Sequence, residues 1–297
     1  MGHQARGVFP SGALDPWAFA LANRLAGNPE EAAVLEGIGG GFAARIRHPM
    51  TIVLAGSPRP VWFAGVPLAF YQPHRLWAGG VLEVADGPGQ HYLVAVSGGW
   101  WAPRWWGSRS QALTMAEAGW YRPPRPGEVL LVAVPGQAPP DGAEGLAPQH
   151  WPRYPAEPTL RVWPGPDFER LRAREALGVA LTVRRFSRMG VVADGPRLYE
   201  GGWAMPSRPT VRGVVEVDGA GQYLILGPER QTTGGYPMPF VVDPLDFGLL
   251  AELGPGSRFR LSLVTHPQEL WEERAARRRL LRSLAAGHGE EQRSPAR

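Results

Sequence analysis

Short apolar runs bounded by Gly, Pro and Asp turns fill most of the chain after Glu36. Runs of four to seven residues fit β-strands, because an amphipathic helix needs a longer segment with apolar positions three or four apart. Strands at this density favour a β-barrel or a β-sandwich. We expect them at 51–55, 81–84, 92–96 and 129–134 in the first half, and at 160–163, 180–184, 211–217, 223–226 and 259–264 in the second.

Helix signals cluster near the N-terminus. Asp15 is a typical N-cap, Pro16 fits the first helical position, and Gly27 is a typical stop. Asn28, with Glu31 at the capping-box position, predicts a second short helix directly afterwards. The second half has two further signals. Asp167 is a candidate N-cap for a helix that ends at Gly178, and a last helix is expected at about 267–284, with Glu273 and Arg277 spaced for an ion pair.

A stretch rich in Pro, Gly and Ala separates two β-rich halves. It shows no periodicity and fits a linker or a long surface connection. We therefore expect a first β-barrel domain at 1–134 with a helical pair at 15–36, a linker at 135–158, a second barrel at 159–268, and a C-terminal helix and tail at 269–297.

Two residue types are absent. The chain has no cysteine, and all 31 basic residues are arginine. Without lysine there is no Schiff base, no pyridoxal-phosphate anchor, no P-loop and no biotin attached to this chain. Without cysteine there is no disulfide or thiolate chemistry, which fits a cytoplasmic protein. The seven His have no metal-ligand spacing, so we expect no metal site.

The charge balance argues against a nucleic-acid partner. The net charge is +4, and seven Arg against five Glu in 269–297 account for half of it. The rest of the chain is nearly neutral, unlike a surface that tracks phosphates. No apolar run approaches the roughly 18 residues of a membrane span, so we expect no membrane partner. Arginine as the sole basic residue, with scarce Asn, suits a hot, GC-rich source.

The segment 230–237 (RQTTGGYP) has the densest set of polar side chains and glycines. Its hydroxyls and amide can donate to carbonyl or carboxylate oxygens, and its glycines allow a ligand to approach the backbone closely. The alternative is a glycine-rich hairpin corner without a ligand.

Two other segments are candidates for function. Four of the 12 Trp fall in 100–106, interleaved with Arg, where they could clamp a planar or anionic ligand or could equally be barrel core. Asn23 and Asn28 are the only asparagines in the chain, which suggests a geometric need. Asn28 is explained as an N-cap, whereas Asn23 lies in mid-helix, where Asn is a poor helix former.

Taken together, these segments resemble the family of 5-oxoprolinase C subunits, also called the biotin-dependent carboxyltransferase or allophanate hydrolase subunit 2 family, which includes the antagonist of a sporulation-kinase inhibitor. The resemblance runs from Gly2 to about Gln268. The matching pieces are 7–15, 22–28, 35–36, 98–99, Pro103, 107–110, 164–166, 188–190, Ser207 and 231–237.

The resemblance implies two tandem cyclophilin-like β-barrel domains in a mainly β fold with a few helices, and a cleft between the domains. It implies a hydrolase that works in a hetero-oligomer with the A and B subunits, in the ATP-dependent opening of the lactam 5-oxoproline to glutamate. Urea amidolyase members instead move a carboxyl group from carboxybiotin to urea. ATP is implied for the complex, with no site assignable to this chain.

The resemblance also implies the site residues. Since arginine must supply every fixed positive side-chain charge, Arg109, Arg188 and Arg230 are the favoured candidates. The implied catalytic residues are Arg188, Gln231, Thr232 and Thr233, and the implied substrate-binding residues are Ser11, Asn23, Ser108, Arg109, Ser110, Met189, Ser207, Arg230, Gly234, Gly235 and Tyr236.

Several positions depart from the family pattern. The aspartate expected before Arg188 is Ser187, and Glu216 replaces a family Gln. Val192, Glu229 and Gln111 replace an Arg, an Asp and a Thr. The family's first strand would lie upstream of Gly2, so we expect either a misplaced start codon or a neighbouring chain that completes the barrel.

Three functions follow from this pattern. The first is an enzyme subunit that acts with the A and B subunits on a small lactam or amide. The second is a non-catalytic regulatory partner of a kinase-inhibitor-like B subunit, which the loss of the aspartate at Ser187 would favour. The third is a carboxyltransferase that uses external carboxybiotin.

Overall fold

The computed structural model describes residues 3–6, 8–87, 89–112, 123–133, 139, 143–200 and 205–287. The chain divides into two units, which we name by their strands. The barrel unit comprises Met1–Asp15, Ser110–Pro123 and Tyr154–Pro267, and the two-sheet unit comprises Pro16–Arg109, Pro124–Arg153 and Gln268–Arg297. Both units are therefore assembled from separate stretches of chain.

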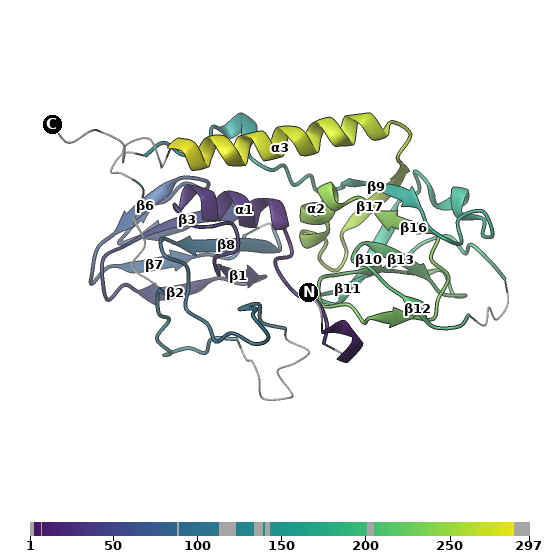
Figure 1. Ribbon diagram of the computed structural model, residues 1–297, viewed down its shortest axis with the longest axis horizontal. Helices are drawn as coiled ribbons and strands as arrows, with labels where there is room; N and C mark the ends of the chain where they lie inside the picture. The colour runs from purple at the N-terminus through teal and green to yellow at the C-terminus, as the bar shows by residue number, and fades with distance from the viewer. Residues whose placement is uncertain are drawn as a thin grey trace. The chain divides into compact units, whose positions relative to one another are not determined.

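The barrel unit contains a closed seven-stranded barrel in the order β10-β11-β14-β13-β16-β9-β17 (Figure 1). Neighbouring strands are antiparallel except β17 and β9, which are parallel. The bounds are Thr159–Pro164 (β9), Leu181–Ser187 (β10), Gly190–Asp194 (β11), Val214–Val217 (β13), Gln222–Leu226 (β14), Phe240–Val242 (β16) and Arg258–Leu263 (β17). All five strands expected in the second half are confirmed, to within a few residues at their ends.

Alternation along the barrel strands places large side chains in the interior, because successive residues of a strand face opposite sides. Leu160, Tyr223, Phe240 and Phe259 are completely buried there. The remaining elements of this unit lie outside the closed sheet. They are η1 (Gln4–Arg6), η4 (Ala173–Ala176), η5 (Pro244–Asp246), α2 (Phe247–Ala251) and a two-stranded ribbon of β12 (Arg208–Pro209) and β15 (Thr233–Gly234).

The two-sheet unit contains two four-stranded sheets, in the orders β1-β8-β3-β6 and β2-β7-β4-β5. The bounds are Leu35–Ile38 (β1), Phe42–Arg45 (β2), Met50–Gly56 (β3), Val61–Phe63 (β4), Val66–Pro67 (β5), Pro73–Leu76 (β6), Val81–Val84 (β7) and His91–Val96 (β8). The expected strands at 51–55, 81–84 and 92–96 are confirmed. With both units in view, the mainly β fold with few helices is confirmed as well.

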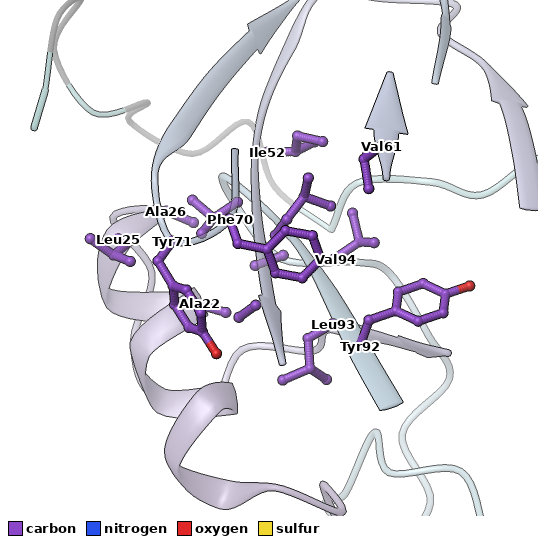
Figure 2. Packing of buried hydrophobic residues seen from close by; sticks show 14 of the residues in the cluster. Ala22, Leu25, Ala26, Ile52, Val61, Phe70, Tyr71, Tyr92, Leu93 and Val94 are labelled. Carbon is purple, nitrogen blue, oxygen red and sulfur yellow. The ribbon is translucent and has the colours of Figure 1, made fainter. Parts of the chain in front are cut away.

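Helix α1 (Pro16–Leu25) covers strands β3 and β8 of the two-sheet unit. Its Ala22 and Leu25 pack into the cluster that contains Ile52 and Val94 (Figure 2). Both strands are almost wholly buried, which explains why their sequences are continuous apolar runs. Helix α1 begins at Pro16 as expected.

The C-terminal helix α3 (Pro267–Gly287) packs on the same core through Leu280, Leu281 and Leu284. Arg277 donates a hydrogen bond of 2.6 Å to Glu273, so the expected helix and its ion pair are both confirmed. No helix of the described residues is long and apolar enough to cross a membrane.

Two expected helices are wrong, and in both cases the expected cap has a distant partner. The chain turns after Asn28, whose side-chain nitrogen donates to Val96 O at 2.8 Å and whose oxygen accepts from the Gly98 N–H at 2.8 Å. After Asp167 the chain forms turns and η4 instead of an α-helix. The Asp167 carboxylate accepts from the Met238 N–H at 2.9 Å, so it does not cap a helix.

The region 123–158 also differs from expectation. Residues 129–131 do not form the expected strand, and Val132 makes an isolated bridge with Trp100, while the last expected position, 134, lies outside the described residues. Within the proposed linker, η3 spans Pro148–His150 and Leu146 is buried in the core of the two-sheet unit. This part of the linker is therefore packed.

Candidate functional site

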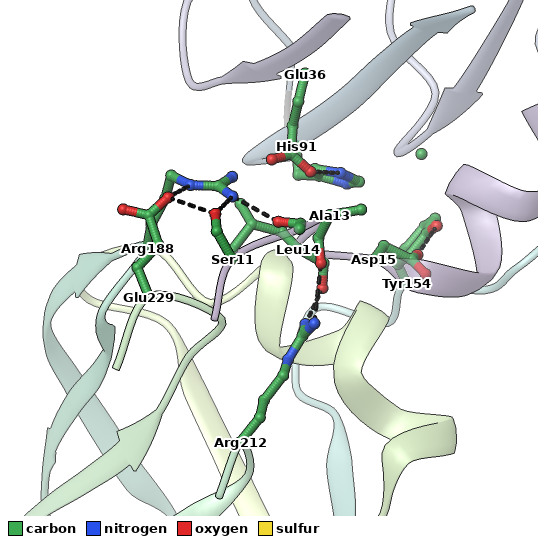
Figure 3. Close-up of polar contacts among 12 residues, drawn as sticks. Ser11, Ala13, Leu14, Asp15, Glu36, His91, Tyr154, Arg188, Arg212 and Glu229 are labelled. Atoms are coloured by element: carbon green, nitrogen blue, oxygen red, sulfur yellow. Dashed lines mark hydrogen bonds and ion pairs between the residues drawn. The ribbon is translucent and has the colours of Figure 1, made fainter. Parts of the chain in front are cut away.

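The N-terminal segment 11–15 is bound to the barrel unit through polar contacts (Figure 3). The Arg212 guanidinium donates to the carbonyl oxygens of Ala13, at 2.9 Å, and of the next residue, at 2.5 Å. The Tyr154 hydroxyl donates to the Asp15 carboxylate at 2.7 Å. The segment has no strand partner among the described residues, so these side chains supply the hydrogen bonds that a sheet would otherwise give its backbone.

Arg188 forms the centre of this network (Figure 3). Its Nε pairs with Glu229, and its Nη2 donates to Gly12 O at 2.5 Å and to Ser11 Oγ at 3.5 Å. Ser11 Oγ in turn donates to Glu229 at 3.2 Å. The Arg188 side chain is 10% exposed and that of Glu229 is 1% exposed. Arg188 and Ser11 are thus brought together, in an arrangement that fixes the N-terminal segment.

The segment 231–236 is held by its backbone and presents its side chains. Thr210 Oγ1 donates to Gln231 O at 2.5 Å, and β15 pairs with β12 through Thr233. The side chains of Gln231, Thr233 and Tyr236 are exposed. Such a fixed backbone with outward hydroxyl and amide groups can bind a polar ligand without reorganising first.

Glu216 lies directly beneath this segment. A Cβ at Gly234 would overlap Glu216 Oε1, so glycine is the residue that fits above the carboxyl group. Glu216 is 5% exposed, and Oε1 has no hydrogen-bond partner among the described residues. Burial raises the pKa of Glu216, and the positive charge of Arg208 partly opposes this shift.

Arg208 belongs to the ribbon strand β12 and pairs with the buried Asp167. Burial alone would raise the pKa of Asp167. Hydrogen bonds from Arg208 and the Met238 N–H, together with the charges of Arg208 and Arg170, outweigh burial and lower that pKa. Asp167 therefore favours its ionised form, and its ion pair with Arg208 holds that arginine near Glu216.

Arg230 is buried at the start of the same segment, 7% exposed. Burial lowers the pKa of its guanidinium, and no carboxylate of the described residues acts on that pKa in the opposite direction. Two other expected residues adjoin the ribbon of β12 and β15. Ser207 is exposed directly before β12, and Gly235 has open space around it.

The expected Trp and Arg segment lies in the two-sheet unit up to Arg109. Trp105 and Ser108 exchange backbone hydrogen bonds of 2.8 and 2.9 Å around a tight turn, with Trp106 and Gly107 at positive φ. Both Trp side chains are 45% exposed, which rejects the core interpretation for them. Arg109 Nη1 donates to a backbone oxygen at 2.8 Å, and Ser108 is exposed. Ser110, which is assigned to the barrel unit, is exposed too.

Asn23 does not present its side chain as a ligand contact. It is completely buried, and its amide nitrogen donates to Glu30 O at 3.1 Å and Ala32 O at 2.9 Å. Its oxygen accepts from Asn28 at 3.1 Å. The two asparagines therefore bind each other, and Asn23 also holds the backbone of the loop after α1.

Four charged residues of this site are not among the site residues predicted from the sequence. Glu216 and Glu229 stood out in the sequence only as departures from the family pattern, and Arg208 and Asp167 did not stand out as site residues at all. A glutamate within the apolar run 214–217 was the available signal for Glu216, because charged residues are rarely buried without a reason.

Two further expectations concern Met189 and metal ions. Met189, expected to bind substrate, lies 39% exposed in the turn between β10 and β11. The described residues include no group of three or more His, Asp or Glu that could hold a metal ion.

Comparison with known families relates this arrangement to known chemistry. A model of the carboxyltransferase domain, subdomain A and B, matches residues 6–263. The chain belongs to this carboxyltransferase family. The match includes both the N-terminal segment held by Arg188 and the segment 231–236.

Three relatives show how far this carboxyltransferase chain resembles known proteins. The C subunit of 5-oxoprolinase from Haemophilus influenzae is 27% identical over 269 residues, which are 87% of this chain and 84% of that protein. In a crystal structure of TTHA0988, the matched chain has 30% sequence identity to this chain and a TM-score of 0.79. The match includes 88% of this chain and 52% of the TTHA0988 chain, so this chain spans about half the length of that one. The K. lactis urea amidolyase has a TM-score of 0.83 at 22% sequence identity, and the match includes 96% of this chain and 19% of that enzyme. This similarity is one of fold.

Proposed function

We propose that this chain is the C subunit of an ATP-dependent 5-oxoprolinase, in which it acts with the A and B subunits to open 5-oxoproline to glutamate. The observation that carries the proposal is the extent of similarity. The chain aligns at 27% identity with a protein named as the C subunit of 5-oxoprolinase, over 87% of this chain and 84% of that protein. Because this alignment extends over most of both sequences, we take that protein as the guide to function.

The segment 231–236 supports amide chemistry. Opening a lactam puts negative charge on the carbonyl oxygen, and fixed N–H and O–H donors stabilise such an oxyanion. Gln231 and Thr233 offer exposed donors on a backbone that Thr210 anchors. We assign the donor role to Gln231, Thr232 and Thr233, and a positioning role to Arg188, whose Nε and Nη2 bind Glu229 and the N-terminal segment.

ATP is proposed for the complex. A stable lactam needs activation before its ring opens, and ATP would supply it. The residues of this chain do not by themselves mark an ATP site, since without lysine there is no P-loop. The proposed partners are the A and B subunits, in the cytoplasm.

A carboxyltransferase that uses external carboxybiotin is the second candidate, favoured by the family model that matches residues 6–263. With no lysine, this chain cannot carry biotin itself, so the carboxyl group would have to come from a separate biotinylated protein. The two candidates differ in this requirement.

Co-expression of the A, B and C subunits tests the proposal. The complex is expected to release glutamate from 5-oxoproline only with ATP, without any biotinylated protein. Replacing Gln231 by Leu removes a donor and should lower kcat by about 100-fold or more. The matched control is Thr182→Val, an exposed position on β10 of the same unit, which should leave kcat unchanged.

No glutamate release with all three subunits present would reject the oxoprolinase role. Release that requires a carboxylated biotin carrier would favour the second candidate. Full activity of a stably folded Gln231→Leu complex would reject the donor role while leaving the oxoprolinase assignment in place.

A further inference from the structure

Arg230 is a buried cation without a counter-ion among the residues that the structure describes. It is 7% exposed, and its Nε is closed off from solvent without an acceptor. The two terminal nitrogens also lack a described acceptor, but they are not sealed from solvent in the same way. The open side of the guanidinium is therefore the side with two parallel donors.

The nearby acids do not neutralise Arg230. Glu229, its neighbour in the chain, pairs with Arg188 and accepts from Ser11. Glu216 interacts electrostatically with Arg208, and burial favours its neutral form. The pKa of Arg230 accordingly shifts through burial alone, without an opposing carboxylate among the described residues.

An unpaired charge in the protein interior is costly, and a buried ion is stable only when a partner compensates for its lost hydration. An anion bound to the terminal nitrogens would supply that compensation, and a carboxylate fits the guanidinium with two parallel hydrogen bonds. The adjoining segment 231–236 offers neutral donors for the rest of such a ligand.

We propose that Arg230 anchors the carboxylate of the substrate, so that the site selects a small lactam or amide acid over a neutral amide. This inference rests on the proposed function and makes it more specific. 5-Oxoproline has both a lactam and a carboxylate, whereas urea has no negative charge. Arg230 therefore distinguishes the two substrates by charge, before any chemistry occurs.

The test is calorimetric binding to the full chain of two ligands that differ by one group. L-5-Oxoproline and 2-pyrrolidinone share the lactam ring, and only the first has a carboxylate. 5-Oxoproline should bind the unaltered chain, and Arg230→Gln should weaken it at least tenfold. 2-Pyrrolidinone should bind weakly and equally to both proteins. Arg184→Gln is the matched control, because Arg184 is an exposed arginine on β10 that pairs with Asp194.

Thermal unfolding guards against a folding defect. Without ligand, Arg230→Gln should unfold at the same temperature as the unaltered chain or higher, because it removes an unpaired buried charge. 5-Oxoproline should raise the unfolding temperature of the unaltered chain and of Arg184→Gln, and leave that of Arg230→Gln unchanged.

Three results would overturn the anchor: no binding of 5-oxoproline to the unaltered chain, equal binding of 2-pyrrolidinone, or undiminished binding to Arg230→Gln. The larger function is tested separately. Turnover of 5-oxoproline by the three-subunit complex with an unchanged KM in Arg230→Gln would retain the function and reject the anchor. Carboxylate-selective binding through Arg230, without turnover in that complex, would retain the anchor and reject the oxoprolinase function.

Discussion

Arg188 and Arg230 belong to the same unit and are both largely buried, yet their surroundings are opposite. Arg188 pairs with Glu229 and donates to Gly12 O, so its charge and hydrogen bonds serve the fold. Arg230 has neither kind of partner among the described residues. Glu229 therefore has its partners within the fold, whereas the adjacent Arg230 has none among the described residues.

This difference separates stabilising charges from binding charges. A buried ion pair is fixed by its own partner, and changing it changes stability. A buried cation without a partner lowers stability instead, so its presence is explained by something that binds to it. The same distinction applies to the carboxylates, since Asp167 is paired with Arg208 and Glu216 has an Oε1 without a partner among the described residues.

The largest effect should come from breaking the satisfied pair. Arg188→Met leaves Glu229 buried without its cation and removes the donor to Gly12 O, so the free energy of unfolding should fall by about 3–5 kcal/mol. Urea unfolding followed by circular dichroism measures this. Arg184→Met is the control, because its ion pair is exposed and should be worth less than about 1 kcal/mol. Equal losses in both variants would contradict the stabilising role of Arg188.

The asparagine pair of the two-sheet unit extends the comparison to neutral groups. Asn28→Ala would leave the Gly98 N–H without its partner, remove one of the two donors to Val96 O, which keeps the Gly99 N–H at 2.8 Å, and remove one bond from Asn23. Because an unsatisfied buried group costs about 1–3 kcal/mol, we expect a loss of about 2–3 kcal/mol in the same urea experiment. An N-cap alone would be worth about 1 kcal/mol, so a loss of that size would favour the capping interpretation.

Eight of the nine expected strands are confirmed, because their apolar runs reflect burial that the barrel and sheets provide. The strand expected at 129–134 is not formed by residues 129–131, and short strands such as β4, β12 and β15 were not predicted. The helix predictions failed where one side chain fitted both a local N-cap and a hydrogen bond to a distant residue. Asn28 and Asp167 both fit an N-cap locally, but Val96 and Met238, far away in the chain, are their partners. Local patterns cannot distinguish these outcomes, since the fold decides which groups are near.

The candidate site shows the same limit. The motif 231–237 and its neighbour Arg230 could be identified from residue types alone. That Arg188 would be occupied by Glu229 and Ser11 could not be, because these groups come from three distant parts of the chain. Charge pairing is a property of the fold, and it decides which arginine is available for a ligand.

A smaller effect should follow from filling the space above the unpartnered acid. Gly234→Ala places a Cβ against Glu216 Oε1, and such overpacking typically costs about 1–3 kcal/mol. Gly235→Ala is the matched control, because no atom lies within 4 Å of its Cβ position. Adding Glu216→Ala to Gly234→Ala should remove most of the clash, so the two changes should be non-additive in urea unfolding. Strict additivity would mean that the two residues do not touch.

The smallest expected effect depends on pH. Burial raises the pKa of Glu216 above its ordinary 4.5, so the folded chain holds this proton more tightly than the unfolded chain. Stability from this group is therefore greatest below pH 4.5 and falls as pH rises towards the folded pKa. Gln has the same shape and does not titrate, so the stability of the unaltered chain minus that of Glu216→Gln should decrease as the pH rises above 4.5.

Asp167 and the other titrating groups are present in both proteins, so their contributions cancel in this difference. Urea unfolding at several pH values measures it. A difference that stays flat would mean that burial does not disfavour the charged form of Glu216. A difference that rises with pH would mean that Arg208 outweighs burial and pairs with an ionised Glu216, as it does with Asp167. In that case Glu216 would join the satisfied charges, and Arg230 would remain as the unpartnered charge next to the segment 231–236.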